Sequence, residues 1–558
     1  MFQIIRRIQN KPIGSKRMLS SLYNYLFPQA NDVHVRNYST NNPIISDEIA
    51  DSFHPKLKTI FQQLDSIAPR FVLNKGDIQI LTHPIEFYEC LKEKITNSKS
   101  RVFLSSLYFG KSQHELVECI DNAMSKNEDL QVFILIDSLR GTREAPKHAS
   151  SASILVPLVE KFGKHRIDIR MYHTPQLNGL TKSWMPKRIN ESWGLQHMKL
   201  YGFDDEILLS GANLSEDYFT NRQDRYYIFK NKDLTDYYFD IQKAVSSLSY
   251  QLLPSTKNEQ GFRLSWPTSN NSCEPHMNMQ RFISDSSFLL EPLLKQHKLK
   301  SFDEFKDTNK FDTIVYPISQ FTPLLQPNND QSTEKPAILR LLSYLDSPKI
   351  KWWFTAGYFN MLPQIQDRLI NGKASGVVIT ASSQANSFYK SPGLSYYIPQ
   401  AYLLCAKRFL EEIHRRGKQD LITLKEWKNG IVNTVDGWSY HAKGLWITVP
   451  EEEEPSVTVI GSSNYTKRAY SLDLESNAII ITKDPELKHQ MKGEIDNLLS
   501  HVDTLDLSAF EPKLQANPKL ETGENGEPLE SKPVYAVDED RKISRRTYLA
   551  VKFFGDKL

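Results

Sequence analysis

Two short segments of the sequence each place a histidine and a lysine two residues apart, followed by an asparagine and then a carboxylate. The first segment contains His197, Lys199, Asn213 and Asp224. A histidine can attack phosphorus or transfer a proton, and a lysine and an asparagine can hold the oxygens of a phosphate. A carboxylate behind the imidazole would orient it and stabilise its protonated form. This combination predicts phosphoryl-transfer chemistry.

The second segment contains His441, Lys443, Asn464 and Glu475. Eleven residues separate the asparagine from the carboxylate in both segments, and a polar insert at 450–456 accounts for the longer stretch before Asn464. One such segment alone is compatible with a surface cluster of ion pairs. Two segments with matched spacing predict two half-sites, one histidine acting as nucleophile and the other as acid and base, with no metal required.

The repeat extends upstream of both segments, which indicates how the chain positions them. The run at 104–109 is similar to the run at 354–359, and each is followed by a helix-length stretch and a second apolar run, at 132–136 and 377–380. Strands that alternate with helices predict α/β units on a mixed or mostly parallel sheet. We therefore expect two homologous halves, at 60–265 and 275–505. We also expect each H-x-K pair to lie on one face of a strand.

The ends of the chain differ in composition from the two halves. Residues 1–31 contain five Lys and Arg and no acid, among apolar residues, which is typical of a mitochondrial transit peptide covering residues 1–38. A basic tail or a surface helix is the alternative. Residues 506–558 predict a largely flexible tail, with an apolar stretch at its end that could dock. The net charge of +3 argues against a nucleic-acid partner.

With these two segments the sequence resembles the phospholipase D superfamily, whose signature is H-x-K-x4-D followed by G-S-x-N. The first copy has His197, Lys199 and Asp204, but its next element reads Ser210-Gly211, in reversed order. The second copy keeps the element with Ser462 and Asn464, but Thr448 replaces the aspartate. The resemblance implies two duplicated α/β/α sandwich halves with one active site at their interface. It also implies that Asp224 and Glu475 support the catalytic histidines.

Longer stretches, at 195–204, 209–227, 316–323, 437–444 and 460–477, look like the eukaryotic phosphatidylglycerophosphate synthases of that superfamily. The resemblance implies phosphatidyl transfer from CDP-diacylglycerol to glycerol 3-phosphate through a phosphatidyl-histidine, with CMP released. It implies peripheral contact with the mitochondrial inner membrane, on the matrix side. By analogy His197 is the nucleophile and His441 the acid and base, although the roles could be reversed. The reaction needs no cofactor.

Further residues are candidates on composition alone. Extra cations for a doubly charged acceptor phosphate are Arg140, Arg143, Arg222, Arg225, Lys467 and Arg468, each of which could equally be a solvated surface charge.

The run Gly110-Lys111-Ser112 resembles the end of a nucleotide-binding loop, but the first glycine of that motif is missing, so we do not expect ATP binding. The loop 182–188 mixes aromatic residues with cations, which suits either an anionic bilayer interface or an ordinary exposed loop.

Three other functions stay open at this stage. A related phosphatidyltransferase or hydrolase, such as a cardiolipin synthase or a phospholipase D, would use another lipid or water as acceptor. A non-catalytic mitochondrial scaffold is favoured only by Thr448. A phosphodiesterase acting on nucleic acid is disfavoured by the near-neutral charge.

Overall fold

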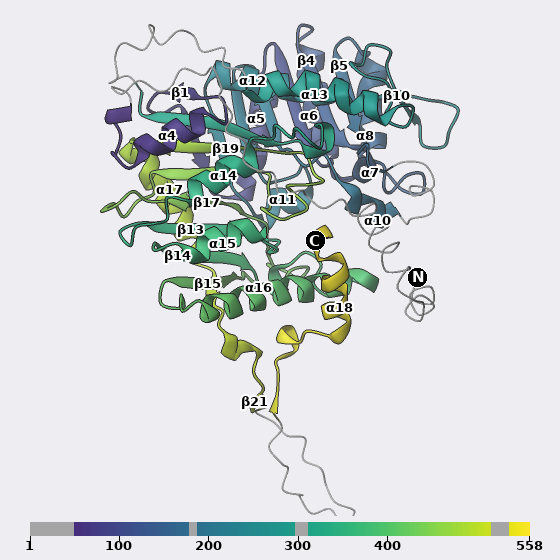
Figure 1. Cartoon of the computed structure of the whole chain (residues 1–558). Coiled ribbons are helices and arrows are strands. Elements are labelled where there is room, and N and C mark those ends of the chain that lie inside the picture. The colour runs from purple at the N-terminus through teal and green to yellow at the C-terminus, as the bar shows by residue number, and fades with distance from the viewer. Residues whose placement is uncertain (1–49, 178–186, 296–310, 515–534) are drawn as a thin grey trace, which may run out of the picture. The chain divides into compact units, whose positions relative to one another are not determined.

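The two halves of the chain form two nine-stranded sheets (Figure 1). The computed structural model describes residues 50–177, 187–295, 311–514 and 535–558. The strands of the first sheet follow in space as β11 (Phe262–Ser265), β10 (Tyr250–Pro254), β5 (Ile167–Tyr172), β4 (Gln131–Asp137), β3 (Arg101–Ser106), β6 (Leu200–Phe203), β7 (Glu206–Ser210), β9 (Tyr226–Phe229) and β2 (Ile78–Leu81). Those of the second follow as β20 (Val502–Thr504), β15 (Ile422–Trp427), β14 (Ser375–Ala381), β13 (Lys351–Ala356), β17 (Lys443–Ile447), β18 (Val457–Gly461), β19 (Glu475–Thr482), β12 (Thr313–Gln320) and β1 (Phe71–Leu73).

The same topology occurs twice. From β10 to β2 in the first sheet, and from β20 to β12 in the second, the strands correspond one to one in order. The pairs β3–β4 and β4–β5 are parallel, as are β13–β14 and β14–β15, whereas their neighbours are antiparallel. The strands expected around 104 and 354 are β3 and β13, and those at 132–136 and 377–380 fall in β4 and β14. The predicted duplicated α/β architecture is confirmed.

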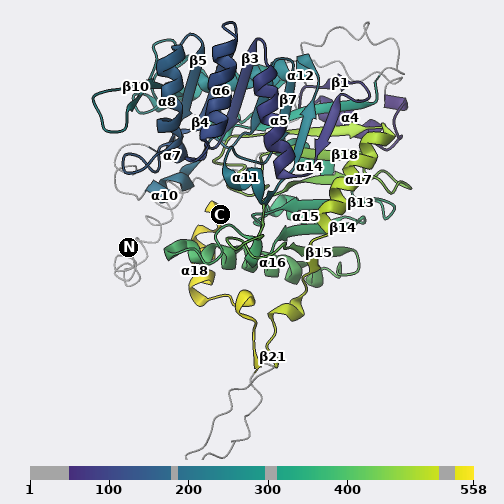
Figure 2. The ribbon, with the colours of Figure 1, turned by 180° about the vertical axis from the view of Figure 1, so that it is seen from behind.

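Helices cover both faces of each sheet. The layer between the sheets consists of α12 (Lys232–Ser246), α13 (Met279–Lys295) and α17 (Pro485–Leu499), whose apolar side chains share one core with both sheets. The outer face of the first sheet packs against α5 (Pro84–Asn97), α6 (His114–Lys126) and α8 (Ser151–Phe162). The outer face of the second packs against α4 (Leu57–Asp65), α14 (Glu334–Leu342), α15 (Pro363–Asn371) and α16 (Ile398–Arg415). The two views show these layers from opposite sides (Figures 1 and 2).

Burial of the sheets on both faces explains their sequences. Every residue of β9, β12 and β19 is buried, and their apolar residues come in runs rather than in strict alternation. Such strands are typical of sheets covered by helices on both sides. The helices are bounded by local signals: Ser150 caps α8 by accepting a hydrogen bond from the Ser153 backbone, and α17 begins with Asp484 and Pro485.

The start of the first half departs from the predicted boundary. Strand β1 pairs antiparallel with β12 of the second sheet, Phe71 lying opposite Val315. Helix α4 packs into the core on the outer face of the same sheet. The chain therefore contributes residues 50–73 to the second half before it builds the first. Residues 40–558 group as one compact unit.

The end of the chain departs from the predicted flexible tail, although its final apolar stretch does dock, as its composition suggested. The described C-terminal range, 535–558, ends with helix α18 (Arg545–Phe554) and the 3-10 turn η8 (Gly555–Lys557). Helix α18 packs beside α16 (Figures 1 and 2). Residues 535–558 are thus docked rather than flexible, because Thr547 and Val551 are buried and Gln400 accepts a hydrogen bond from the Thr547 hydroxyl. The predicted transit peptide, at 1–38, and most of the loop at 182–188 lie outside the described residues.

Shorter elements connect the layers. They are α7 (Ser138–Gly141), α10 (Lys187–Asn190), η1 (Glu191–Trp193), α11 (Glu216–Thr220), η3 (Thr322–Leu324), η4 (Ser383–Ala385), η5 (Gly393–Tyr397), η6 (Leu507–Phe510), η7 (Glu539–Arg541) and the strand pairs β8 (Arg222–Gln223) with β16 (Ser439–Tyr440) and β21 (Lys513–Leu514) with β22 (Tyr535–Ala536). Among the helices that the structure describes, none is both long and apolar enough to cross a bilayer.

Candidate active site

The two motif segments meet because each pairs with a segment of the opposite half. The backbone N–H of His197 donates to the carbonyl of Leu474, next to Glu475, at 2.9 Å. The backbone N–H of His441 donates to the carbonyl of Gln223, next to Asp224, also at 2.9 Å, and β16 pairs with β8 just before it. Backbone pairing therefore places each histidine opposite the carboxylate of the other half.

His197 forms the first crossed pair. Its Nδ1 lies 2.9 Å from Oε1 and 3.1 Å from Oε2 of Glu475. The hydroxyl of Ser462 donates to Oε2 of the same carboxylate. A neutral imidazole that donates its Nδ1–H to Glu475 has its lone pair on Nε2, and among the described residues no hydrogen bond occupies that atom. Nε2 of His197 is thus available to attack an electrophile.

His441 forms the second crossed pair, with different surroundings. Its Nδ1 lies 2.6 Å from Oδ2 of Asp224 and 2.6 Å from Nζ of Lys443. Its Nε2 lies 3.3 Å from the hydroxyl of Tyr218. The half-sites are therefore unequal, because His197 faces only a carboxylate at Nδ1 whereas His441 faces a carboxylate, an ammonium group and a phenol.

The reversed Ser210-Gly211 order has a steric cause. A Cβ on Gly211 would lie 2.6 Å from Oδ1 of Asp224 and 2.8 Å from Nζ of Lys443. Ser210 instead turns its hydroxyl to the carbonyl of Arg225. In the second half Ser462 occupies the place of Gly211, and there its hydroxyl supports Glu475. Each half thus keeps a residue at this position that fits its own carboxylate.

Both lysines lie beside their histidines. Nζ of Lys199 donates to the carbonyl of His197 at 2.7 Å, and Nζ of Lys443 donates to the carbonyl of His441 at 2.9 Å. The H-x-K residues do share one side of the chain, but His197, Lys199 and His441 lie just outside the strands that they lead into. Two buried ammonium groups provide positive charge for a phosphate.

Burial dominates the protonation of the site. Burial, and secondly the charge of Lys199, hold the pKa of His197 well below its usual value. Burial followed by Lys443 does the same to the pKa of His441. Burial raises the pKa of Glu475 to about 7 and lowers the pKa of Lys199 to about 7 and of Lys443 to about 8. Both imidazoles are therefore neutral before substrate binds, as a nitrogen nucleophile requires.

The two asparagines differ in their contacts. The backbone N–H of Leu107 donates to Oδ1 of Asn213, whose Nδ2 donates to Tyr218. Oδ1 of Asn464 is buried and has no hydrogen-bond partner among the described residues. Turning the Asn464 amide over would put its Nδ2 donor at that position. Asn464 therefore has a polar group left for a ligand, whereas Asn213 is linked to His441 through Tyr218.

Asp204, predicted with the catalytic set, lies elsewhere. It follows β6 at the far end of that strand, and its carboxylate accepts hydrogen bonds from the backbones of Lys99, Ser100 and Arg101. Thr448 holds the equivalent place in the second half, where its hydroxyl accepts from the Lys351 backbone at 3.0 Å. Neither residue contacts a motif histidine, because both serve to join neighbouring strands.

Arg225, predicted to bind a substrate phosphate, is instead committed to the protein. Its guanidinium is buried and donates to both carboxylate oxygens of Glu494 and to the carbonyls of Lys443 and Val459. It also lies over the ring of Trp446. Arg225 thus joins the two halves and has no N–H left for a ligand.

The other predicted cations are nearer to solvent, and each has an acidic partner. Arg222 and Arg468 lower the pKa values of His441 and His197 respectively, so their charges act on the site. Arg222 pairs with Asp217 and lies over the ring of Tyr218. The remaining pairs are Arg468 with Asp473, Arg140 with Glu144, Arg143 with Glu191 and Lys467 with Asp556. Arg222 and Arg468 are the best placed to meet a second phosphate.

Aromatic residues around His441 escaped the sequence prediction. The rings of Tyr218 and Tyr358 stand edge-on to the imidazole, at centroid distances of 5.1 and 5.4 Å. Tyr358 belongs to the repeated run after β13, so its recurrence as Tyr108 in the first half was the available signal. Tyr218 has no counterpart in the repeat, and only the fold brings it to His441.

The weak nucleotide loop is used for packing. The N–H of Gly110 donates to the carbonyl of Leu214, and a Cβ on Gly110 would lie 2.8 Å from Cβ of Ser215. Lys111 and Ser112 are exposed in the turn before α6. The expectation that ATP does not bind stays a prediction. In the described part of the chain no three His, Cys, Asp or Glu side chains gather as metal ligands would.

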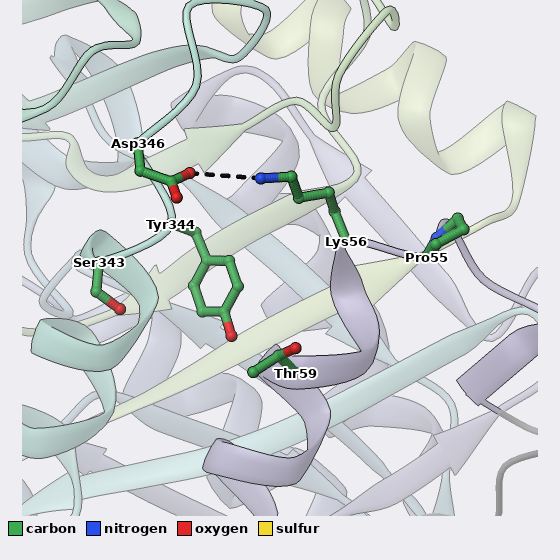
Figure 3. A pocket seen from close by; sticks show the side chains of 6 residues that line it. All are labelled: Pro55, Lys56, Thr59, Ser343, Tyr344 and Asp346. Atoms are coloured by element: carbon green, nitrogen blue, oxygen red, sulfur yellow. Dashed lines mark ion pairs between the residues drawn. The ribbon is translucent and has the colours of Figure 1, made fainter.

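The sequence contains a third H-x-K run, His54-Pro55-Lys56, which lies away from the crossed pairs. Lys56 lines a surface cavity of about 550 Å³ between α4 and the end of α14, where it pairs with Asp346 at 3.5 Å (Figure 3). None of the repeated motif residues lines this cavity. The candidate active site is therefore the crossed histidine–carboxylate cluster at the interface of the halves.

Comparison with known proteins finds relatives that match most of the chain. The chain is 51% identical over 446 residues to the CDP-diacylglycerol–glycerol-3-phosphate 3-phosphatidyltransferase of Saccharomyces pastorianus, covering 79% of this chain and 85% of the relative. The enzyme of the same name from Saccharomyces cerevisiae is 49% identical, covering 84% and 89%. The mitochondrial enzyme of Cricetulus griseus is 31% identical, covering 81% and 82%.

The chain belongs to the CDP-diacylglycerol–glycerol-3-phosphate 3-phosphatidyltransferase family. The family fold also appears in a more distant structure, the phosphatidylserine synthase of Haemophilus influenzae Rd KW20. That structure superposes with a TM-score of 0.60 at 20% identity and covers 81% of this chain and 92% of its own. No family model matches the sequence. The duplicated fold is therefore shared well beyond the transferase family itself.

Proposed function

We propose that the protein transfers the phosphatidyl group of CDP-diacylglycerol to glycerol 3-phosphate, giving phosphatidylglycerophosphate and CMP. The observation that carries the proposal is the crossed pairing of His197 with Glu475 and of His441 with Asp224. It provides two imidazoles with separate supports at one interface, as a two-step displacement requires. The names of the relatives at 51% and 49% identity support the choice of substrates.

In the first step Nε2 of His197 attacks the phosphatidyl phosphorus, and the bond from that phosphorus to the CMP oxygen breaks. The negative charge of the bound donor favours the protonated form of His441, which takes up a proton as the donor binds and then donates it to the departing CMP. Glu475 stabilises the positive charge that develops on His197. Lys199, Lys443 and Asn464 hold the non-bridging oxygens, where negative charge grows.

In the second step a hydroxyl of glycerol 3-phosphate gives its proton to His441 and attacks the same phosphorus. The phosphorus–nitrogen bond breaks and His197 is regenerated. The assignment of His197 as nucleophile is supported by its unoccupied Nε2, since the hydroxyl of Tyr218 already faces Nε2 of His441. The reaction uses neither ATP nor a metal ion. Arg222 and Arg468 would hold the acceptor phosphate.

The location of the reaction follows from its substrate. Relatives from Cricetulus griseus and Mus musculus are named as mitochondrial enzymes, which supports a mitochondrial location. The diacylglycerol chains of the donor stay in a bilayer, so the enzyme must work at a membrane surface. We place it on the matrix side of the inner membrane, in peripheral contact.

Purified full-length protein tests the proposed reaction when it is given CDP-diacylglycerol with and without glycerol 3-phosphate. The expected result is CMP and phosphatidylglycerophosphate, formed only with the acceptor. CMP release without acceptor would indicate a hydrolase, and use of phosphatidylglycerol as acceptor would indicate a cardiolipin synthase. If the folded protein released no CMP, a non-catalytic mitochondrial scaffold would be the remaining explanation.

Trapping the intermediate tests the roles of the histidines. The His441→Ala variant should accumulate a phosphatidyl group on His197 when it is incubated with labelled CDP-diacylglycerol. The His197→Ala variant should carry no label. His54→Ala, at the third H-x-K match, is the matched control and should turn over normally. Label on His441 in the His197→Ala variant would reverse the assignment.

A further inference from the structure

Helix α18 presents an unusual face to solvent. Its buried residues are Thr547 and Val551, and the opposite face carries Tyr548, Leu549 and Phe553. Leu549 is 56% exposed and Phe553 is 55% exposed. A surface helix of a soluble protein normally directs charged residues outward. Here the outward face combines large apolar side chains with cations.

The apolar surface continues onto a neighbouring element. In the turn η5, Leu394 is 79% exposed and Tyr396 is 45% exposed. The turn η5 leads directly into α16, on which α18 packs, and Arg546 of α18 donates to the hydroxyl of Tyr397 at 3.4 Å. We call Leu394, Tyr396, Tyr548, Leu549 and Phe553 the α18–η5 patch.

The charges on α18 itself are all positive. Helix α18 contains Arg545, Arg546 and Lys552 and no acid, and all three cations are exposed. Among the ion pairs of the described residues, none neutralises these three cations. Cations interleaved with aromatic and aliphatic side chains suit the boundary of an anionic bilayer, where the apolar groups enter the acyl region and the charges reach the headgroups.

The patch is physically connected to the active site. The carbonyl of Gly555, directly after α18, accepts from Asn360, two residues from the Tyr358 that stands against His441. Asp556 pairs with Lys467, three residues after Asn464. Lys557 lies over the ring of Trp193, four residues before His197. The C-terminal end of α18 therefore rests on the segments that carry the catalytic residues.

We propose that the α18–η5 patch is the surface by which this enzyme docks onto an anionic lipid bilayer, with α18 lying in the plane of the headgroups. The proposal rests on the membrane contact proposed above and identifies the residues that make it. Docking there brings the interface of the two halves to the bilayer surface, so that the donor phosphate reaches His197 while the acyl chains stay in lipid. A fixed C-terminal helix performs this docking with no spanning segment among the described residues.

Co-sedimentation with vesicles tests the docking surface. Full-length protein should bind vesicles of phosphatidylcholine with cardiolipin more tightly than phosphatidylcholine alone. The double variant Leu549→Glu with Phe553→Glu should lose about tenfold or more in affinity, because two exposed apolar groups that would enter the lipid are replaced by charges repelled from anionic lipid. Arg545→Gln with Arg546→Gln should reduce the preference for cardiolipin and its dependence on salt.

The matched control is Met277→Glu with Phe288→Glu. Met277, just before α13, is 72% exposed, and Phe288, within α13, is 84% exposed. Helix α13 lies well away from α18 (Figure 1). The control adds the same charge and should bind vesicles as the wild type does. Equal loss in both double variants, or no loss in the α18 variant, would overturn the proposal. Dimerisation that depends on Leu549, without vesicle binding, would make the patch a contact between two copies and also overturn it.

Activity in two substrate forms separates this proposal from the proposed function. With CDP-diacylglycerol in detergent micelles the α18 double variant should turn over at the wild-type rate, whereas with vesicles it should slow in proportion to its lost binding. A folded variant that is inactive in micelles would show that the patch belongs to the active site, against the proposal. Wild-type protein that binds vesicles through the patch but releases no CMP would contradict only the proposed reaction.

Discussion

Oε1 of Glu475 lies 2.9 Å from Nδ1 of His197, although 278 residues separate them in the sequence and they belong to different halves. Asp224 stands in the same relation to His441. Each half therefore supplies one histidine and the carboxylate that supports the histidine of the other half. Neither half alone holds a complete catalytic pair.

The crossed carboxylates should be needed for turnover. Glu475→Gln removes the negative charge that stabilises the imidazolium of His197, so kcat should fall about a hundredfold to ten-thousandfold with little change in KM. Ser462→Ala removes only a hydrogen bond to the same carboxylate and should cost about threefold to tenfold. Steady-state CMP release measures both effects. Wild-type kcat in folded Glu475→Gln would show that the pair is not catalytic.

The hydroxyl of Tyr218 should contribute to positioning His441. Tyr218→Phe removes the contact with Nε2 of His441 and the acceptor for Asn213, so kcat/KM should fall by about threefold to tenfold. The pH profile of kcat should shift as well, since the hydroxyl favours the neutral imidazole. Tyr88→Phe is the control, because its hydroxyl pairs with Glu115 at the surface. An unchanged pH profile would assign Tyr218 to packing alone.

The aspartate of the first motif should matter for stability rather than chemistry. Asp204→Ala leaves the backbone donors of residues 99–101 without their acceptor, which should lower the free energy of unfolding by about 1–3 kcal/mol. The kcat of the folded fraction should stay near the wild-type value. Denaturant titration and active-fraction assays separate the two effects.

Restoring the second motif should bring no gain. In the second half the N–H groups of Lys349 and Ile350 already donate to Ser347, so an aspartate at position 448 would be buried with too few donors. Thr448→Asp should therefore lower stability by about 1–3 kcal/mol and leave kcat unchanged. A rise in kcat would mean that this position acts on His441.

The buried pair of Arg225 and Glu494 should hold the two halves together. Arg225→Met leaves Glu494 buried without its partner and should cost about 3–5 kcal/mol of unfolding free energy. Arg225→Met combined with Glu494→Leu should recover part of that loss, because no unpaired charge stays buried. Arg222→Gln, close by in sequence, should change KM for glycerol 3-phosphate instead. A double variant no more stable than the single one would contradict the pairing argument.

Glu334 should make stability depend on pH. Burial, and next the charge of Glu475, raise the pKa of Glu334 from 4.5 to about 8, although the nearby side chains of Ser463, Tyr470 and Asn477 oppose the shift. Between these values the native state keeps a proton that the unfolded chain releases. The free energy of unfolding should therefore fall with rising pH, by at most about 1.4 kcal/mol per unit.

Glu334→Gln should remove this part of the slope, which urea titrations from pH 5 to 8 would measure. Asp137, whose pKa burial also raises to about 8, is present in both proteins and cancels in the comparison. Identical slopes in the two proteins would show that Glu334 is ionised in the native state.

The sequence predicted the chemistry of the site better than its contacts. The repeat identified both H-x-K pairs and the two carboxylates, because their spacing is local and was preserved in both copies. Which carboxylate faces which histidine depends on pairing between residues 223 and 441 and between 197 and 474, and no spacing along the chain encodes that choice. Arg225 was misplaced for the same reason: its partner Glu494 lies 269 residues away.

The early strand β1 constrains how the protein can be made. Phe71–Leu73 pair with β12, and the apolar face of α4 packs on the same sheet, yet some 240 residues, including the whole remainder of the first half, are synthesised between them and their partners. A chain delivered N-terminus first exposes Leu57, Phe61 and Leu64 until residue 313 and beyond have arrived. Residues 50–73 are thus synthesised early but find their partners late, and we expect folding to depend on what covers their apolar face in the meantime.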